Sequence, residues 1–143
     1  MTVKAILSLK GGDVATIRPT ASLATAAKVL AERRIGALVV RDSSNRLVGI
    51  LSERDIVRAL AERGAAALDE RLDQAMTRSI VTCTEAMTVS EIMKRMTAGK
   101  FRHVPVVEFG RLVGIVSIGD VVKYRLATMQ HESQSMREYV LAA

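Results

Sequence analysis

Aromatic residues, cysteine and long apolar runs are all scarce in this chain of 143 residues. Aromatic residues make up 3% of the sequence and Trp is absent, so the side chains on which single-stranded nucleic acids usually stack are nearly missing. No apolar run approaches the roughly 18 residues that cross a membrane. The first residues also lack the apolar core and cleavage site of a secretory signal. These absences predict no membrane partner and argue against nucleic acid.

The chain also lacks the residue patterns of common catalytic and metal sites. Cys83 is the only cysteine, so no intramolecular disulfide can form, which suits the reducing cytoplasm as the expected location. Cys83 ends an apolar run, and we interpret it as a core residue rather than as a thiol nucleophile paired with His103. Neither His103 nor His131 has the cysteine or carboxylate spacing of a zinc site, and no glycine-rich phosphate loop is present. The sequence therefore predicts no catalysis, no metal and no required cofactor.

The sequence is rich in aliphatic and basic residues. Hydrophobic residues make up 49% of the chain, enough for a core of Val, Ile, Leu, Ala and Met. The formal net charge is +6, with Lys and Arg spread along the chain rather than gathered in one block. We interpret this as a solvated surface with a basic bias, and a basic patch for a phosphate-bearing ligand is the alternative.

An internal repeat determines the predicted architecture. The segment Arg46–Val57 returns as Arg111–Val122, and both copies contain Gly-Ile-x-Ser-x-x-Asp. Upstream, Val14–Thr16 matches Ile80–Thr82 at an offset one residue longer, and the extra residue falls in a turn. A length difference confined to a turn indicates that a folded unit was duplicated.

Each copy predicts the same order of elements, β-α-β-β-α. A short apolar strand leads to a capped amphipathic helix, a hairpin of two apolar strands and a closing helix that begins at Ser52 or Ser117. The expected strands are 14–17, 37–41 and 47–51 in the first copy, and 80–83, 104–107 and 112–117 in the second. The predicted fold class is therefore α/β of the α+β kind.

Neither copy is long enough to bury a stable core alone, because each is shorter than about 70 residues. We expect the two repeats to pack sheet against sheet with pseudo-two-fold symmetry and to leave clefts between them. The predicted boundaries are 1–68 for the first repeat with its lead-in and linker, 69–126 for the second repeat, and 127–143 for a C-terminal helical tail. The tail carries a sparse apolar stripe that packs on its own module, contacts a partner or frays.

The sequence resembles a tandem pair of cystathionine-beta-synthase (CBS) domains, an arrangement often called a Bateman module. The most specific marks are Gly49–Asp55, Gly114–Asp120 and Phe101–Val107. Asp73–Thr77 looks like the short lead-in that precedes a CBS repeat, and Val3–Ser8 resembles a diverged copy of it. The resemblance covers most of the chain and holds in both halves.

The resemblance implies a stand-alone regulatory module that binds an adenosine-containing ligand. AMP is the first expectation, and ADP, ATP, NAD and S-adenosylmethionine are the other ligands that the family uses. The resemblance also implies a homodimer of CBS pairs and a downstream protein whose identity the sequence does not give. The competing classes are a basic nucleic-acid-binding protein and an interaction scaffold without a ligand.

The repeated Ser-x-x-Asp stands where a strand is expected to become a helix. One interpretation is a capping box, in which both side chains satisfy free N–H groups at the start of the helix. The other is ligand contact, because a helix N-terminus attracts phosphate and a carboxylate accepts hydrogen bonds from two ribose hydroxyls. By resemblance, Asp55 and Asp120 are candidate ribose contacts, with Ser52 and Ser117 near the phosphate.

The remaining candidate contacts differ between the copies. Arg102 and His103 of the second copy are the main candidates for phosphate contact, and Arg54 takes that role in the first, so we expect two unequal clefts. A surface arginine and a strand-edge histidine are the structural alternative. The resemblance adds an adenine pocket, lined partly by backbone groups, at Thr16, Ile17 and Pro19 in one copy and at Thr82, Cys83 and Thr84 in the other. The glycine ahead of each serine, Gly49 or Gly114, is expected to let a ligand approach the backbone.

Overall fold

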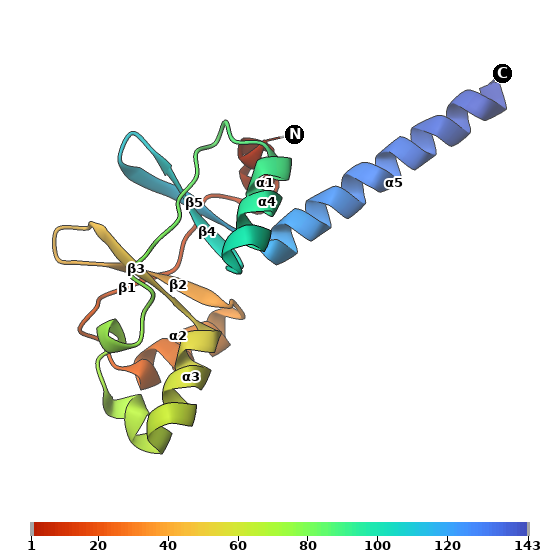
Figure 1. The fold of residues 1–143 in the computed structure, drawn as a ribbon. Coiled ribbons are helices and arrows are strands. Elements are labelled where there is room, and N and C mark those ends of the chain that lie inside the picture. The colour runs from red at the N-terminus through yellow and green to blue at the C-terminus, as the bar shows by residue number, and fades with distance from the viewer. Residues whose placement is uncertain (1, 143) are drawn as a thin grey trace. The chain divides into compact units, whose positions relative to one another are not determined.

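The computed structural model describes residues 2–142, apart from the side chains at positions 131, 138, 141 and 142. The helices are α1 (Val3–Lys10), α2 (Leu23–Arg33), α3 (Glu53–Arg63), α4 (Val89–Gly99) and α5 (Ile118–Ala142), with two short 3₁₀ helices, η1 (Gly64–Asp69) and η2 (Leu72–Gln74). The strands are β1 (Thr16–Ile17), β2 (Ala37–Arg41), β3 (Leu47–Ser52), β4 (His103–Glu108) and β5 (Arg111–Ser117) (Figure 1). The predicted α+β class is confirmed, and the order β-α-β-β-α is present in the first repeat, whereas the second repeat has all of its elements except the first strand.

The chain forms two compact units that do not follow the order of the sequence. The first-repeat unit consists of residues 13–82, and the second-repeat unit combines residues 1–12 with residues 83–143. The first lead-in therefore belongs to the unit of the second repeat, and the second lead-in belongs to the unit of the first.

The first-repeat unit is a three-stranded sheet with two helices. Strand β2 pairs in parallel with β1 and antiparallel with β3, and Ala37 lies opposite Ser52. Helix α2 begins at Leu23 because the Ser22 hydroxyl accepts a hydrogen bond from the Thr25 N–H at 3.1 Å. The core is aliphatic and is made mainly by Leu23, Ala26, Leu30, Leu38, Val40, Leu51, Ile56, Ala59, Ala67, Leu72 and Met76. Because Ala67 in η1 is fully buried, the expected linker around Gly64–Leu68 is an ordered part of this unit.

The second-repeat unit is built on the β4–β5 hairpin. His103 lies opposite Ser117 at one end, and a left-handed Phe109 with Gly110 closes the turn at the other. The Thr88 hydroxyl caps α4 by accepting the Glu91 N–H at 3.1 Å. The core consists of Val3, Ile6, Leu7, Cys83, Val89, Ile92, Met96, Val104, Val106, Val116 and Val121. Cys83 is thus a core residue, as predicted.

The predicted strand over residues 80–83 is wrong, because only a single parallel bridge between Cys83 and Val106 forms there. In the first repeat, the Val39 N–H donates to the Ala15 carbonyl at 3.1 Å and extends the pairing of β1 with β2. The residue that corresponds to Val39 is Pro105, which has no N–H to donate to Val81. One proline therefore shortens the first strand of the second repeat.

Each lead-in packs against the glycine of the repeat in its own unit. A Cβ atom at Gly114 would lie 2.6 Å from Cδ2 of Leu7 in α1, and a Cβ atom at Gly49 would lie 2.6 Å from the sulfur of Met76. The expectation that a ligand approaches the backbone at these glycines is wrong, since side chains of the lead-ins fill that space. The glycines are required for packing of the two lead-ins.

Candidate functional site

Asp120 stands at the turn from β5 into α5 in the second-repeat unit. Its Oδ2 atom accepts the Ser117 N–H at 2.9 Å, and its own N–H donates to the Ser117 hydroxyl at 3.1 Å, which are the two bonds of a capping box. The Lys10 ammonium of α1 also donates to Asp120 Oδ2 at 2.6 Å and to the Ile115 carbonyl at 2.8 Å. Within the described part of the chain, Asp120 Oδ1 accepts no hydrogen bond, so one carboxylate oxygen is left for a ligand.

The surroundings of Asp120 stabilise its charged form. Burial alone would raise its pKa, but hydrogen bonds from Lys10 and Ser117 and the positive charge of Lys10 outweigh it and hold the pKa below the ordinary 3.8. The side chain is 21% exposed. Asp120 is therefore an ionised acceptor that a ligand in solution can reach.

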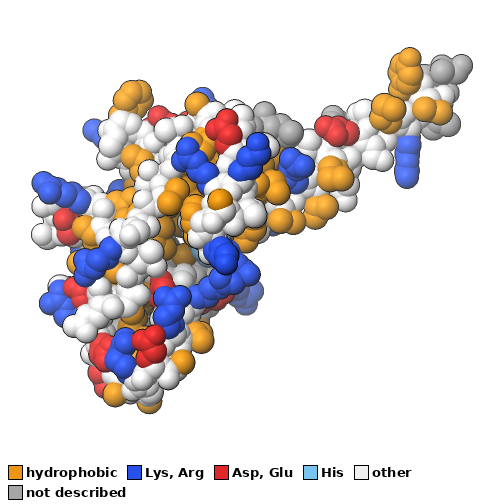
Figure 2. Space-filling model, viewed as in Figure 1, with side chains coloured by type: hydrophobic (Ala, Val, Ile, Leu, Met, Phe, Trp, Pro, Cys, Tyr) orange, Lys and Arg blue, Asp and Glu red, His pale blue; other side chains and the backbone are white. Residues whose placement is uncertain are grey.

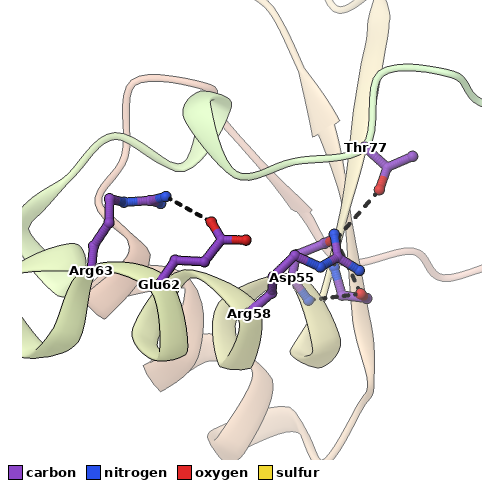
Figure 3. A network of polar contacts seen from close by, with 6 residues as sticks. Asp55, Arg58, Glu62, Arg63 and Thr77 are labelled. Carbon is purple, nitrogen blue, oxygen red and sulfur yellow. Dashed lines mark hydrogen bonds and ion pairs between the residues drawn. The ribbon is translucent and has the colours of Figure 1, made fainter.

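Asp55 occupies the matching turn from β3 into α3 in the first-repeat unit, but its carboxylate is enclosed. Oδ2 accepts the N–H of Ser52 at 2.9 Å and its hydroxyl at 3.1 Å. On the other side, Oδ1 faces the Thr77 hydroxyl and the Arg58 guanidinium, each at 3.5 Å (Figure 3). Asp55 is only 5% exposed, so both of its oxygens are surrounded by groups of its own unit.

The predicted phosphate contacts of the second repeat lie at the same end of their sheet. Strand pairing puts His103 directly opposite Ser117, and the Arg102 carbonyl accepts the first N–H of α5, from Ile118, at 2.8 Å. The Arg102 side chain is exposed. This end of the second-repeat unit therefore gathers Arg102, His103, Ser117 and Asp120 around one helix N-terminus, where phosphate is favoured.

The first repeat offers fewer side chains for such contacts. Arg54 lies in the first turn of α3 and is exposed, while Gly36 and Ala37 stand where the second repeat has Arg102 and His103. The Gly36 carbonyl accepts the Glu53 N–H at 3.0 Å, which repeats the backbone geometry of the second unit without its cation and imidazole.

The predicted adenine-pocket residues fall on both units. Thr16 and Ile17 form β1, and the Pro19 carbonyl accepts the Asp73 N–H at 3.3 Å in the first-repeat unit. Thr82 and Thr84 are exposed on either side of the buried Cys83.

The polar groups of Cys83 are already used inside the second-repeat unit. Its N–H donates to Pro105 and its carbonyl accepts from Val107, at 3.0 and 2.9 Å. Burial, and to a smaller extent the nearby Glu108 carboxylate, raises the pKa of the Cys83 thiol to about 11 against the opposing charge of Arg95. The thiol is therefore neutral at physiological pH and is no nucleophile.

Sequence reasoning missed the side chains that distinguish the two aspartates. A hollow of about 200 Å³ beside Asp120 is lined by Ile6, Leu9, Lys10, Lys123, Tyr124 and Ala127 as well as by Asp120 itself. Lys10 follows the first lead-in at the end of α1 and Thr77 ends the second lead-in, and both lie far in sequence from the aspartates that they contact. Lys123 could have been found from the sequence, because a residue three positions after Asp120 lies on the same face of the predicted helix.

No group of three or more His, Cys, Asp or Glu side chains among the described residues is placed to hold a metal ion; the His131 side chain lies outside that set. No helix in the described part of the chain combines the length and hydropathy of a membrane span.

Comparison with known proteins identifies the family. The model of the CBS domain matches twice, over residues 3–62 and 72–127. The chain belongs to the CBS-domain family. A CBS-domain-containing protein from Agrobacterium tumefaciens, of known crystal structure, is 49% identical, with 87% of this chain and 92% of that chain covered and a TM-score of 0.85. The chain is thus a tandem CBS pair.

Two further solved CBS proteins carry ligands. A CBS domain protein from Pyrobaculum aerophilum, solved with AMP, is 30% identical over 90% of this chain and 99% of that chain, with a TM-score of 0.76. The CBS pair of protein MJ0100, solved with 5′-methylthioadenosine and S-adenosyl-L-methionine, is 30% identical over 90% of this chain and 98% of that chain, with a TM-score of 0.80.

The CBS chain spans two thirds or less of the curated relatives that it matches. It covers 66% of an uncharacterised 17.7 kDa protein from Acidianus ambivalens, at 40% identity over 111 residues. It covers 58% of a mitochondrial CBS-domain protein from Arabidopsis thaliana, at 32% identity over 119 residues.

Proposed function

We propose that this CBS pair is a regulatory module without catalysis that binds an adenosine-containing ligand, AMP in the first place, through the Asp120 half-site. The observation that carries the proposal is the ionised Asp120 beside a hollow at the N-terminus of α5, whose Oδ1 atom accepts no hydrogen bond from the residues that the structure describes. Ribose presents two neighbouring hydroxyl donors, which suit a carboxylate acceptor. The ligand-bound CBS structures from Pyrobaculum aerophilum and of protein MJ0100 support an adenosine ligand.

The other predicted contacts complete a half-site of the right chemistry. Ser117 and the N-terminus of α5 offer donors to a phosphate, and Arg102 and His103 stand at the same end of the sheet. In the proposed module, Asp55, Ser52 and Arg54 form a second half-site with weaker or no binding, because Asp55 is enclosed. The candidate adenine contacts remain those that the resemblance implied, Thr16–Pro19 in one repeat and Thr82–Thr84 in the other.

Calorimetric titration of AMP, ATP, NAD and S-adenosylmethionine tests the proposal. We expect AMP to bind the parent protein and an Asp120→Asn variant to lose roughly ten- to a hundred-fold in affinity, since an amide replaces a charged acceptor. Asp69→Asn, at the end of η1, is the matched control and should bind as the parent does. An Asp120→Asn protein that binds AMP with parental affinity would remove Asp120 from the site.

Oligonucleotide binding and thermal melting distinguish the two competing functions from the proposed one. A nucleic-acid-binding protein would bind oligonucleotides with a steep dependence on salt and ignore free nucleotides. A scaffold without a ligand would show no rise in melting temperature across a nucleotide panel, whereas a bound ligand stabilises the folded state. The homodimer, the downstream protein and the cytoplasmic location remain parts of the proposal, the last supported by the single buried cysteine.

A further inference from the structure

The hollow beside Asp120 contains more positive than negative charge. Two basic residues, Lys10 and Lys123, and one acidic residue, Asp120, line it. Ile6 and Leu9 of α1 and Tyr124 of α5 supply the apolar walls. A hollow with two cations and one anion favours a ligand group that carries negative charge.

Lys10 has a donor to spare. Its ammonium carries three N–H donors, of which one reaches Asp120 Oδ2 and another the Ile115 carbonyl, at 2.6 and 2.8 Å. Because these two acceptors hold Lys10 in place, its third N–H is fixed next to the carboxylate at little further entropic cost. The side chain is 31% exposed, so a ligand can reach it.

Lys123 supplies the second cation on the same face of α5. It lies one helical turn after Asp120, and in the described part of the chain its ammonium has no hydrogen bond or ion pair. An ammonium without a partner at the rim of a hollow can turn toward an anion without breaking an existing contact.

We infer that Lys10 and Lys123 form an anion subsite that makes the Asp120 half-site select a phosphate-bearing adenosine ligand over an uncharged one. This rests on the proposed function and adds the residues that set its specificity. Lys10 keeps its bonds to Asp120 and Ile115 and donates its third hydrogen to the phosphate. A sulfonium ligand such as S-adenosylmethionine is disfavoured, because its positive charge meets two lysines.

Paired titrations with AMP and 5′-methylthioadenosine test the subsite, because the two ligands share adenosine and differ in the 5′ group. Lys123→Gln should weaken AMP binding about ten-fold and leave 5′-methylthioadenosine binding unchanged. Lys10→Gln should weaken AMP binding more than 5′-methylthioadenosine binding, because it removes a phosphate donor as well as a partner of Asp120. Lys4→Gln, an exposed lysine of the same helix α1, is the matched control and should change neither affinity. Lys10→Arg should keep most of the preference for AMP.

The outcomes separate the subsite from the site itself. If the parent protein binds both ligands and neither glutamine variant changes the ratio of their affinities, the subsite is wrong while the proposed function stands. If the parent binds neither ligand, both are wrong. Lys123→Gln removes no hydrogen bond or ion pair of the described residues, so it is expected to stay folded. Thermal melts show whether Lys10→Gln stays folded.

A second inference concerns the exposed face of α5. Along this helix Val122, Leu126, Met129, Met136 and Val140 are between 47% and 66% exposed. With Ser133 they follow one another at alternating spacings of four and three residues, which is the a/d pattern of a coiled coil. Figure 1 shows α5 as one unbroken helix, and Figure 2 shows hydrophobic side chains along its outer part. Tyr124 lies outside this seam, and Lys123 flanks its first position, Val122.

We propose that this seam pairs in parallel with α5 of a second copy of the chain. In this register Ser133 is an a position and Met136 is a d position. In a parallel pair, the g residue that precedes an a position lies next to the e residue that follows the next d position of the partner. Those positions hold Glu132 and Arg137, whose charges are opposite. In an antiparallel pair like positions would face each other, and Glu132 would meet a second Glu132.

Analytical ultracentrifugation of the full chain over a range of concentrations tests the pairing. We expect a reversible dimer that a Met129→Glu/Met136→Glu double variant weakens at least ten-fold, because two charges would enter the apolar seam. Glu132→Arg should weaken the dimer, and adding Arg137→Glu should restore it. The control is Gln134→Glu, outside the seam, which should leave the dimer intact.

Two results would overturn this inference. One is a parent protein that stays monomeric at every concentration, and the other is a dimer that the two methionine substitutions leave unchanged. The parallel direction would be wrong if Glu132→Arg/Arg137→Glu forms no tighter a dimer than Glu132→Arg alone.

Discussion

The two Ser-x-x-Asp turns have the same sequence motif but differ in what surrounds the carboxylate. Asp55 is 5% exposed and has neighbours on both oxygens, from Ser52, Thr77 and Arg58. Asp120 has one oxygen bound by Ser117 and Lys10 and a hollow at its side. The motif therefore caps a helix in both repeats, while the side chains packed beside each aspartate determine how far its carboxylate is exposed.

The largest expected difference between the two turns is in the unfolding free energy that is lost when each carboxylate is removed. Asp55→Ala should cost about 2–3 kcal/mol of unfolding free energy, because a buried cap and its partners are lost together. Asp120→Ala should cost about 1 kcal/mol, the usual value for a helix cap nearer the surface. Urea unfolding of both variants measures these values. Equal losses would show that enclosure of Asp55 adds nothing to its capping role.

The two lead-in contacts provide the next comparison. Gly49→Ala would place its Cβ atom 2.6 Å from the Met76 sulfur and 3.1 Å from the Thr77 carbonyl oxygen, which belongs to the backbone. Gly114→Ala would meet only the flexible end of Leu7. We expect a cost of about 1–3 kcal/mol at Gly49 and about 1 kcal/mol or less at Gly114.

Thermal unfolding of the two alanine variants checks this order. Gly110→Ala serves as a reference for a glycine with open space around it and a positive φ of 74°, where only backbone strain is added. A larger fall in melting temperature for Gly114→Ala than for Gly49→Ala would show that α1 is held more rigidly than η2 and the residues after it.

Much of the fold could be predicted from the sequence because its signals are local. The repeat of Arg46–Val57 at Arg111–Val122 predicted both hairpins and both closing helices, and apolar patterns with polar caps predicted α2 and α4. The strand over 80–83 was predicted wrongly because its propensity is local, whereas its failure depends on Pro105 in a neighbouring strand. Pairing of strands is a long-range property that residues 80–83 do not contain.

The candidate site could be predicted only in part, for the same reason. The motif placed Ser52, Asp55, Ser117 and Asp120 at helix starts, where the structure has them. That Lys10 lies 2.6 Å from Asp120 depends on the exchange of lead-ins between units, and a distance of 110 positions in sequence carries no signal of it. Gly49 and Gly114 show the same limit, because a glycine in a strand fits a ligand or a side chain equally well.

The smallest expected effect is the dependence of stability on acid, which isolates the Lys10–Asp120 pair. Because the folded-state pKa of Asp120 lies below its ordinary value, mainly through Lys10 and Ser117 acting against burial, its ionised form stabilises the folded protein. That contribution is complete above the unfolded pKa of about 3.9 and is lost as the pH falls through the lower folded value. Lys10→Gln should therefore be less stable than the parent at neutral pH and approach it in acid.

Urea unfolding of the parent and of Lys10→Gln at a series of pH values from neutral to below 4 measures this convergence, and an NMR titration of the Asp120 carboxyl gives its pKa directly. Asp55 offers no such lysine, so Arg58→Gln, which removes its exposed cation, is the comparison in the other unit. A constant gap between parent and Lys10→Gln at every pH would mean that Lys10 stabilises the fold through packing or through the Ile115 carbonyl alone. In that case the difference between the two turns would lie in their exposure and not in their electrostatics.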